Sequence, residues 1–186
     1  MDKSLLAGFS IFADADTAAL DAIAGTCRVT EHAVGDEVFA QTAVAQEFYG
    51  VLEGAVELVL VISEKVVNTT IEYEEALTVS REVLERPFVV ETLGAGDVFG
   101  WSSMVVPPGR WTATARCTAP TRVLTVAAAD LHRLFEANPT LGYHFMRRLG
   151  GVISQRLHRR TEELVDAWGE AFGGGVNNLT PGSGTI

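Results

Sequence analysis

The stretch LGAGDVFG, residues 93–100, decides the fold of this chain. Gly94 and Gly96 allow a tight turn between strand-like segments. Similar glycine turns stand at Gly35–Asp36 and Glu53–Gly54. Short apolar segments separated by such turns predict a compact barrel or jelly roll, because closure hides the edges of the sheets.

Several segments between residues 28 and 127 have the length and composition of short strands. They are RVTEH (28–32), DEVFAQ (36–41), FYGVL (48–52), AVELVLVIS (55–63), PFVVETL (87–93), TATARC (112–117) and RVLTV (122–126). Together they predict a mainly β fold with flanking helices: a double-stranded β-helix, or jelly-roll-like β-roll, over residues 28–127. We expect the domain to span residues 1–172 and a flexible tail to follow at 173–186.

Helix signals flank the strands on both sides. Before the roll, Asp14 or Asp16 can cap a helix that runs to a stop at Gly25. After the roll, AAADLHRLFEAN (127–138) indicates a short helix, and Pro139 starts a new helix at a first-turn position. We therefore expect N-terminal helices and a long C-terminal helix over 139–172.

The long helix carries one apolar stripe. At about 1.5 Å per residue it is about 50 Å long, and a small roll cannot cover a stripe of that length. We therefore predict a homodimer, in which the same helix of a second chain covers it. The residues expected at the dimer seam are Leu141, Phe145, Leu149, Val152, Leu157 and Leu164.

Residues 63–86 interrupt the regular pattern of strands and turns. The segment is rich in glutamate, yet it contains the β-branched run VVNTTI (66–71). It is either a long hairpin or loop that projects from the roll, or an arm that binds a protein partner.

Composition is that of an ordinary globular protein: 47% of the residues are hydrophobic and 20% are charged. The sequence contains no apolar run that could span a membrane and no recognisable secretory signal. Cys27 and Cys117 are expected to be reduced, so we predict a cytoplasmic protein. The net charge of −10 repels DNA and acidic membranes, so neither is expected as a partner.

Three motifs relate this order of elements to a known family. They are GDEVF (35–39) with FYGVLEGAV (48–56), LGAGDVFG (93–100), and RWTATA (110–115). They resemble the cyclic nucleotide-binding domain of the catabolite-activator and FNR regulators and of the regulatory subunits of cAMP-dependent kinase. The resemblance covers about residues 9–168 and implies the β-roll fold. It does not include the winged helix-turn-helix of those regulators, so we expect a stand-alone domain that does not read DNA.

The resemblance also implies a ligand site. In the family, the segment after Phe-Gly is a short helical turn whose backbone N–H groups hold the cyclic phosphate. The matching positions here begin at Gly100 and continue with Trp101, Ser102 and Ser103. The family's nucleotide binders carry a glutamate in place of Trp101, and this glutamate accepts the ribose hydroxyl. An indole accepts no hydrogen bond, so the sequence predicts poor binding of ordinary cAMP.

The family's phosphate-binding arginine has two readings in this chain. Counted forward from Phe99, Arg110 takes its place; counted backward from Thr114, Trp111 does. A shift of one residue turns a strand side chain to the opposite face, so Arg110 is either a ligand of the phosphate or a guanidinium on the surface. The candidate pocket, for a cyclic nucleotide or another small anionic or aromatic ligand, comprises Gly100, Trp101, Ser102, Ser103, Arg110, Trp111, Thr112 and Thr114. The alternative is that these threonines and tryptophans are ordinary strand and barrel-mouth residues.

Signals of catalysis are missing from the sequence. The four histidines and two cysteines show no metal-ligand spacing, and neither a nucleophile elbow nor a Walker loop is present.

The long helix carries a cluster of five arginines: Arg147, Arg148, Arg156, Arg159 and Arg160. They either pair with nearby acidic residues along a dimer seam or contact an anion or nucleic acid. We predict a non-enzymatic ligand-sensing or regulatory module without a metal or a bound cofactor. The alternative is a degenerate domain that serves in dimerisation, partner binding or assembly.

Overall fold

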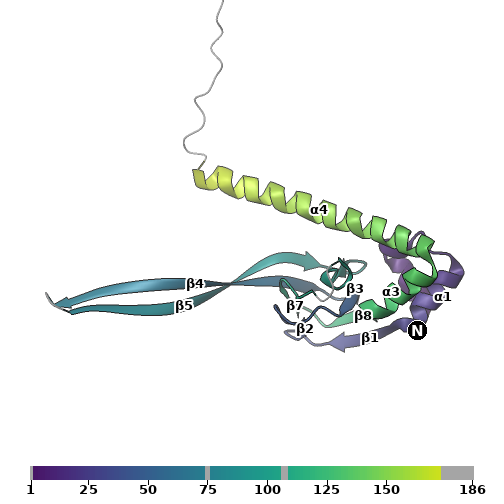
Figure 1. The fold of residues 1–186 in the computed structure, drawn as a ribbon, viewed down its shortest axis with the longest axis horizontal. Helices are drawn as coiled ribbons and strands as arrows, with labels where there is room; N and C mark the ends of the chain where they lie inside the picture. The colour runs from purple at the N-terminus through teal and green to yellow at the C-terminus, as the bar shows by residue number, and fades with distance from the viewer. Residues whose placement is uncertain (1, 74–75, 106–108, 173–186) are drawn as a thin grey trace, which may run out of the picture. The chain divides into compact units, whose positions relative to one another are not determined.

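A computed structural model describes residues 2–73, 76–105 and 109–172, without the side chains of residues 65–83. The contacts divide the chain into two units, Met1–Phe145 and Met146–Ile186. The described strands belong to the first unit (Figure 1). The tail predicted at 173–186 lies outside the described residues.

The predicted β-roll is confirmed as two four-stranded antiparallel sheets. The first sheet has the order β1–β8–β3–β6, with β1 at Cys27–His32, β8 at Thr121–Ala127, β3 at Glu47–Glu53 and β6 at Val98–Phe99. The second has the order β2–β7–β4–β5, with β2 at Glu37–Phe39, β7 at Thr114–Cys117, β4 at Val56–Tyr73 and β5 at Ala76–Leu93. Of these, β6 is the strand that sequence analysis did not separate from its glycine turn, because it is only two residues long.

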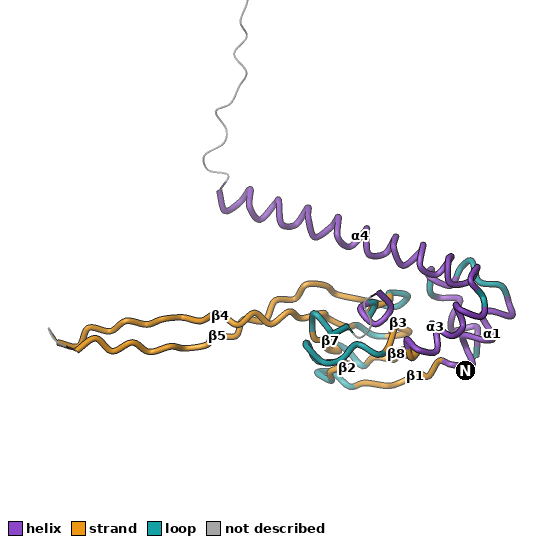
Figure 2. The backbone as a smooth tube through the Cα atoms, viewed as in Figure 1, coloured by secondary structure: helices purple, strands orange, loops and turns teal. Residues whose placement is uncertain are grey.

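Residues 63–73 and 76–86 form the outer part of the β4–β5 hairpin (Figure 2). The two strands stay paired from Val56 opposite Leu93 to Tyr73 opposite Ala76. Strand β7 pairs with β4 only as far as Val59, so the rest of the hairpin continues as a two-stranded ribbon. The prediction of a projecting hairpin is thus confirmed, whereas the partner-binding role stays a prediction.

Short helices precede the roll, and two further helices follow it. The first elements are the 3₁₀ helices η1 (Lys3–Gly8) and η2 (Ser10–Phe12) and the helix α1 (Thr17–Thr26). Asp16 caps α1, because its Oδ1 accepts a hydrogen bond of 2.8 Å from the backbone N–H of Ala19. The expected stop at Gly25 is off by one residue, since α1 continues to Thr26.

The helices after the roll have nearly the predicted bounds. They are α3 (Ala128–Ala137) and α4 (Pro139–Phe172). Asn138 separates them, and its Oδ1 accepts a hydrogen bond of 3.1 Å from the N–H of Leu141 in the first turn of α4. Gly142 allows the two helices to approach closely, since a Cβ there would lie 2.8 Å from Cβ of Phe135.

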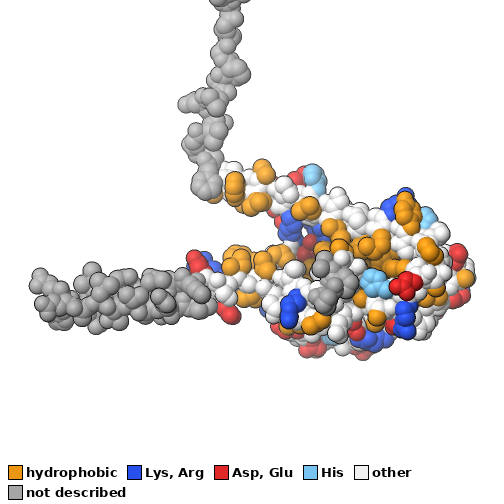
Figure 3. Space-filling model, in the orientation of Figure 1, with side chains coloured by type: hydrophobic (Ala, Val, Ile, Leu, Met, Phe, Trp, Pro, Cys, Tyr) orange, Lys and Arg blue, Asp and Glu red, His pale blue; other side chains and the backbone are white. Residues whose placement is uncertain are grey.

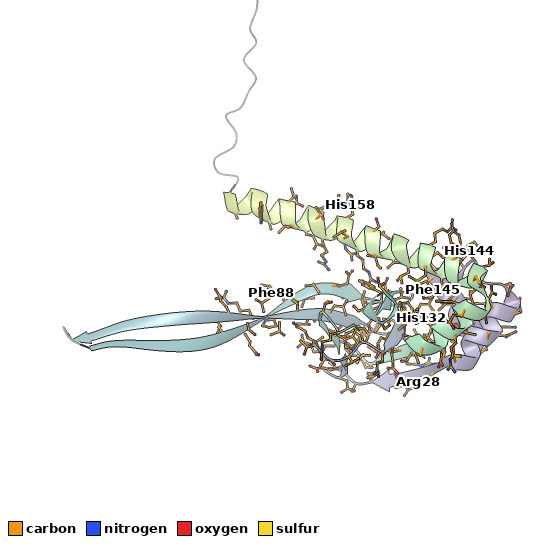
Figure 4. All side chains as sticks on the ribbon, in the orientation of Figure 1. Arg28, Phe88, His132, His144, Phe145 and His158 are labelled. Carbon is orange, nitrogen blue, oxygen red and sulfur yellow. The ribbon has the colours of Figure 1, made fainter. Side chains whose placement is uncertain are left out.

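The beginning of α4 belongs to the core of the first unit. Phe145 is 1% exposed, and its ring centroid lies 5.9 Å from that of Phe12, 5.4 Å from Phe48 and 4.9 Å from Phe135 (Figure 4). Leu141 and Leu149 are buried as well, and Val152 is half-buried. The structure therefore assigns Leu141 and Phe145, the first residues of the predicted dimer stripe, to the core of the first unit.

The second part of the stripe is exposed. Leu157 is 66% exposed, and Leu164, Val165 and Trp168 are each more than half exposed. One flank carries an ion pair within the helix, between Arg160 and Glu163. His158 and Glu162 are 3.2 Å apart, a contact between charges only when the imidazole is protonated. Arg160 therefore pairs with an acidic neighbour on its own helix, whereas pairing along a dimer seam stays a prediction.

Among the described residues, no helix combines the length and the apolar character that crossing a membrane would need. Cys27 and Cys117 are free thiols. Burial raises the pKa of Cys27 to about 11 and also raises the pKa of Cys117.

Candidate functional site

The site begins at the turn between β6 and the short helix α2 (Ser102–Val105). Gly100 has φ +78°, and a Cβ at this position would lie 2.7 Å from Cδ2 of Tyr49 and 3.0 Å from the carbonyl oxygen of Glu47. Only glycine fits such a backbone and such a space. The side chain of Ser103 is turned inward, where its Oγ donates to the carbonyl oxygens of Gly100 and Glu47 at 2.8 and 2.9 Å.

A small cavity lies beside this turn. Its volume is 40 Å³, and the residues that line it are Phe39, Leu58, Gly100, Trp101, Ser102, Trp111, Thr112 and Ala113. Pockets for small molecules usually measure about 300–1,000 Å³. The cavity as it stands therefore has space for about one water molecule.

Aromatic rings fill the interior of the roll next to the cavity. Trp111 is 5% exposed and stacks on Phe39 with ring centroids 4.1 Å apart at 18°. Tyr49 stacks on Phe99 at 5.1 Å and 17°. Tyr49, Phe99 and Trp111 belong to one buried cluster, and the partly buried Phe39 packs against it. Trp111 is therefore part of the core as well as a wall of the small cavity.

The backbone around Trp111 is paired with the segment that joins β2 to β3. Its N–H donates to the carbonyl oxygen of Ala43 at 2.9 Å, and its own carbonyl oxygen accepts from the N–H of Thr42 at 2.9 Å. Thr42 has a φ of +69°, a conformation that a β-branched residue rarely adopts. These two bonds fix the backbone at Trp111, and the stacking on Phe39 places its indole.

Arg110 lies on the other side of this backbone. It is exposed, and its Nη1 donates a hydrogen bond of 2.6 Å to the carbonyl oxygen of Thr42. It does not line the cavity. The guanidinium of Arg110 therefore lies on the surface, as in the second of the two sequence interpretations, and it is bound to the backbone of Thr42.

The structure brings together five of the eight candidate pocket residues: Gly100, Trp101, Ser102, Trp111 and Thr112. Ser103 is bonded inward, and the Oγ1 of Thr114 accepts a hydrogen bond of 2.9 Å from the N–H of Gln41. The hydroxyls of these two residues serve local structure.

A polar network beneath the turn was missed by sequence analysis. The hydroxyl of Tyr49 donates to Oε2 of Glu47 at 2.9 Å, and the other carboxylate oxygen of Glu47 accepts from Arg28. Burial, with the adjacent Glu47 carboxylate, strongly raises the pKa of Tyr49. The i, i+2 spacing of Glu47 and Tyr49 on one strand could have predicted their contact. The sequence does not show that Arg28 on β1 lies beside them.

A second, more polar cavity of 340 Å³ lies where α1 and α4 begin. Its polar lining residues are Asp14, Asp16, Asn138, Thr140 and His144. Asp16 and Asn138 are already engaged as helix caps. Nδ1 of His144 is 3.8 Å from the carboxylate of Asp14, which is a contact between charges only when the imidazole is protonated. Within the described part of the chain, no cluster of three or more potential metal ligands occurs.

These features define a cyclic nucleotide-binding-type β-roll, and the family comparison agrees. The profile of the cyclic nucleotide-binding domain matches residues 29–138. The chain therefore belongs to the cyclic nucleotide-binding domain family, as the sequence motifs predicted.

Individual relatives extend this result. The chain is 35% identical over 78 residues to the Pycsar effector protein PaPycTIR of Pseudomonas aeruginosa. The match covers 42% of this chain and 24% of that protein, so the chain spans about a quarter of the length of this curated relative.

Two solved structures share the fold. A candidate cyclic nucleotide-binding protein from Geobacter metallireducens GS-15 superposes with a TM-score of 0.64 at 24% identity, covering 85% of this chain and 99% of that one. The catabolite activator protein of Thermus thermophilus gives a TM-score of 0.56 at 21% identity, covering 83% of this chain and 61% of that one. At these identities the likeness shows the fold alone.

Proposed function

We propose that this chain is a non-enzymatic regulatory module whose family ligand site has departed from the form that binds ordinary cAMP. The observation that carries the proposal is the 40 Å³ cavity, which Trp111 and Phe39 leave beside Gly100. A cyclic nucleotide needs several times that volume. Its entry would have to displace the indole of Trp111, which stacks on Phe39 and is 5% exposed.

The polar groups at the cavity support the same proposal. Trp101 lines it where the family's nucleotide binders carry a glutamate. Arg110, the candidate for the phosphate, is bonded to Thr42. Each missing hydrogen bond to a charged group weakens binding by about 1.5–3 kcal/mol, or about one to two decades of affinity.

The absence of enzymatic activity is part of this proposal. The groups whose pKa is raised most, Tyr49 and Cys27, are shifted mainly by burial. Neither side chain lines the cavity at Gly100. The likeness to an effector protein supports a part in a signalling response. The net charge of −10 supports partners other than DNA.

Calorimetry with cAMP tests the proposal. We expect no saturable heat at low micromolar ligand for the wild-type protein, and none for Trp101→Glu, because Trp111 and Arg110 keep their places in that variant. A low micromolar dissociation constant for wild type would contradict the proposal. A thermal-shift panel of cyclic mono- and dinucleotides on the same protein then separates a module with another ligand from a degenerate one, since a ligand of the native state raises Tm.

A second function, assembly through α4, is supported by a separate observation. Leu157 and Leu164 are seven residues apart, Trp168 follows four residues later, and all three are more than half exposed. This spacing forms a narrow apolar seam of the coiled-coil kind. We propose that the same seam of a second chain covers it and that the module works as a homodimer.

A further inference from the structure

The β4–β5 ribbon beyond the roll has apolar side chains and lacks a third strand. A two-stranded antiparallel ribbon is marginally stable by itself in water. Strand β7 leaves β4 at Val59, and β5 is the last strand of its sheet. The ribbon therefore exposes two strand edges and two faces that a partner could use.

Side chains block both edges at the base of the ribbon. On β4, the amide of Gln41 binds Val61 twice: Oε1 accepts from its N–H at 2.8 Å, and Nε2 donates to its carbonyl oxygen at 3.2 Å. The backbone groups of Val61 thus point away from β5. Pro87 lies directly opposite Val61, so by the antiparallel pattern its nitrogen faces the outer edge of β5 and has no hydrogen to donate. Addition of a strand is disfavoured at both edges.

One face of the ribbon remains available. Leu60 is opposite Phe88, Ile62 is opposite Arg86, and Glu64 is opposite Leu84. Alternate residues point to the same side, so these side chains share one face, which we call the ribbon face: Leu60, Ile62, Glu64, Leu84, Arg86 and Phe88. Phe88 is 47% exposed, with Ile62 and Leu84 similarly exposed. Hydrophobic side chains are visible at this end of the hairpin in Figure 3, and Phe88 is labelled in Figure 4.

The charges of the ribbon face balance. Arg86 and Glu64 are diagonal neighbours, with Nε and Oε2 3.6 Å apart. A face with one cation, one anion and an apolar remainder does not select a strongly basic or acidic partner. It is, however, complementary to itself, as an interface with two-fold symmetry requires.

We propose that the ribbon face binds the ribbon face of a second copy of this chain. A two-fold axis parallel to the strands lays β4 of one copy over β5 of the other. Leu60 then faces Phe88, and Glu64 comes beside Arg86 of the other copy. Because a ribbon is narrow, this interface is smaller than a stable one of about 800 Å² per partner. The association is therefore weak and depends on concentration.

Mixing of two charge variants tests the proposal in a background without the α4 seam. The background carries Leu157→Asp and Leu164→Asp. Arg86→Glu gives one variant two acidic side chains on the ribbon face, and Glu64→Arg gives the other two basic ones. Neither variant can form the pair within its own chain, so any Arg–Glu attraction in the mixture arises between chains.

Sedimentation velocity measures the outcome at up to submillimolar protein. We expect the background protein and the equimolar mixture to dimerise about tenfold more tightly than either variant alone. Phe88→Ser should abolish the association, whereas Val34→Ser, at an exposed valine of the β1–β2 loop, should leave it unchanged.

Circular dichroism checks that each variant is folded. A background protein that is monomeric throughout, or a dimer that none of the ribbon substitutions weakens, overturns the proposal. Neither result depends on cAMP, so the calorimetric test above stands independently.

Discussion

The interior of the β-roll and the outer half of α4 are both rich in large apolar side chains. These side chains are buried in the roll, whereas on α4 they are exposed. In the roll, Trp111 stacks on Phe39 and is 5% exposed. On α4, Trp168 is 64% exposed. Stacked rings close the interior of the roll, whereas the apolar side chains of the outer half of α4 are exposed. This contrast supports the two proposals that α4 serves association and that the roll has little space for a ligand.

The strongest test of this contrast is removal of the internal tryptophan. Trp111→Ala deletes a buried ring and leaves a cavity beside Phe39, so we expect a loss of about 3–5 kcal/mol in the free energy of unfolding. Urea denaturation measures the loss. Indole should restore part of it by entering the new cavity, as apolar ligands enter engineered cavities. A loss below about 1 kcal/mol would mean that Trp111 is not part of the core.

The outer half of α4 should respond in the opposite way. Leu157→Asp with Leu164→Asp should convert a dimer to a monomer, because the proposed seam would bury two carboxylates. The Tm of the roll should change little once dissociation is taken into account. Light scattering at micromolar concentration reads the mass, and Val34→Asp is a control at another exposed apolar residue. A wild-type monomer that keeps its helix contradicts the dimer.

Two glycine turns compare tight and open parts of the roll. Gly54 and Gly35 both have φ +89°. A Cβ at Gly54 would lie 2.4 Å from the carbonyl oxygen of Pro120, whereas a Cβ at Gly35 would have no atom within 4 Å. Gly35→Ala should lower the free energy of unfolding by about 1–2 kcal/mol for backbone strain alone. Gly54→Ala should cost about 1–3 kcal/mol more, through the clash. Equal losses in chemical denaturation would show that the turn at Gly54 can open.

The smallest expected effect is a decrease of stability in alkali. Burial holds the pKa of Cys27 at about 11, above its ordinary value of 9.0. The unfolded thiol therefore ionises first, and stability present below pH 9 is lost as the pH rises toward 11. The loss is about 1 kcal/mol after allowance for partial exposure. Above pH 10 the raised pKa of Tyr49 adds a loss of the same sign. Cys27→Ala should flatten the unfolding profile between pH 9 and 10; an unchanged profile would assign the loss to another group.

Much of the fold could be predicted because it depends on local chemistry. The cap at Asp16, the start of α4 at Pro139 and the glycine turns follow from backbone geometry within a few residues. The alternation of short strands with turns gave the roll, and the helical spacing gave the length of α4. The two-residue strand β6 was missed because so short a strand has no periodicity of its own.

The candidate site could be predicted only in part. Gly100, Trp101 and Ser102 lie together at the cavity, because the turn that carries them is local. The placement of Trp111 and Arg110 was open in the sequence. It depends on pairing with Thr42 and Ala43, which lie far away along the chain.

By itself the sequence determined the β-roll, the family and the bounds of the long helix, since turns, caps and periodicity act between near neighbours. Tertiary structure decided which apolar residues are covered. Phe145 and Leu157 belong to the same stripe, yet the first is 1% and the second 66% exposed. It also decided that the indole of Trp111 fills the roll while the guanidinium of Arg110 stays outside. Burial depends on which distant segments meet, and neither composition nor periodicity contains that information.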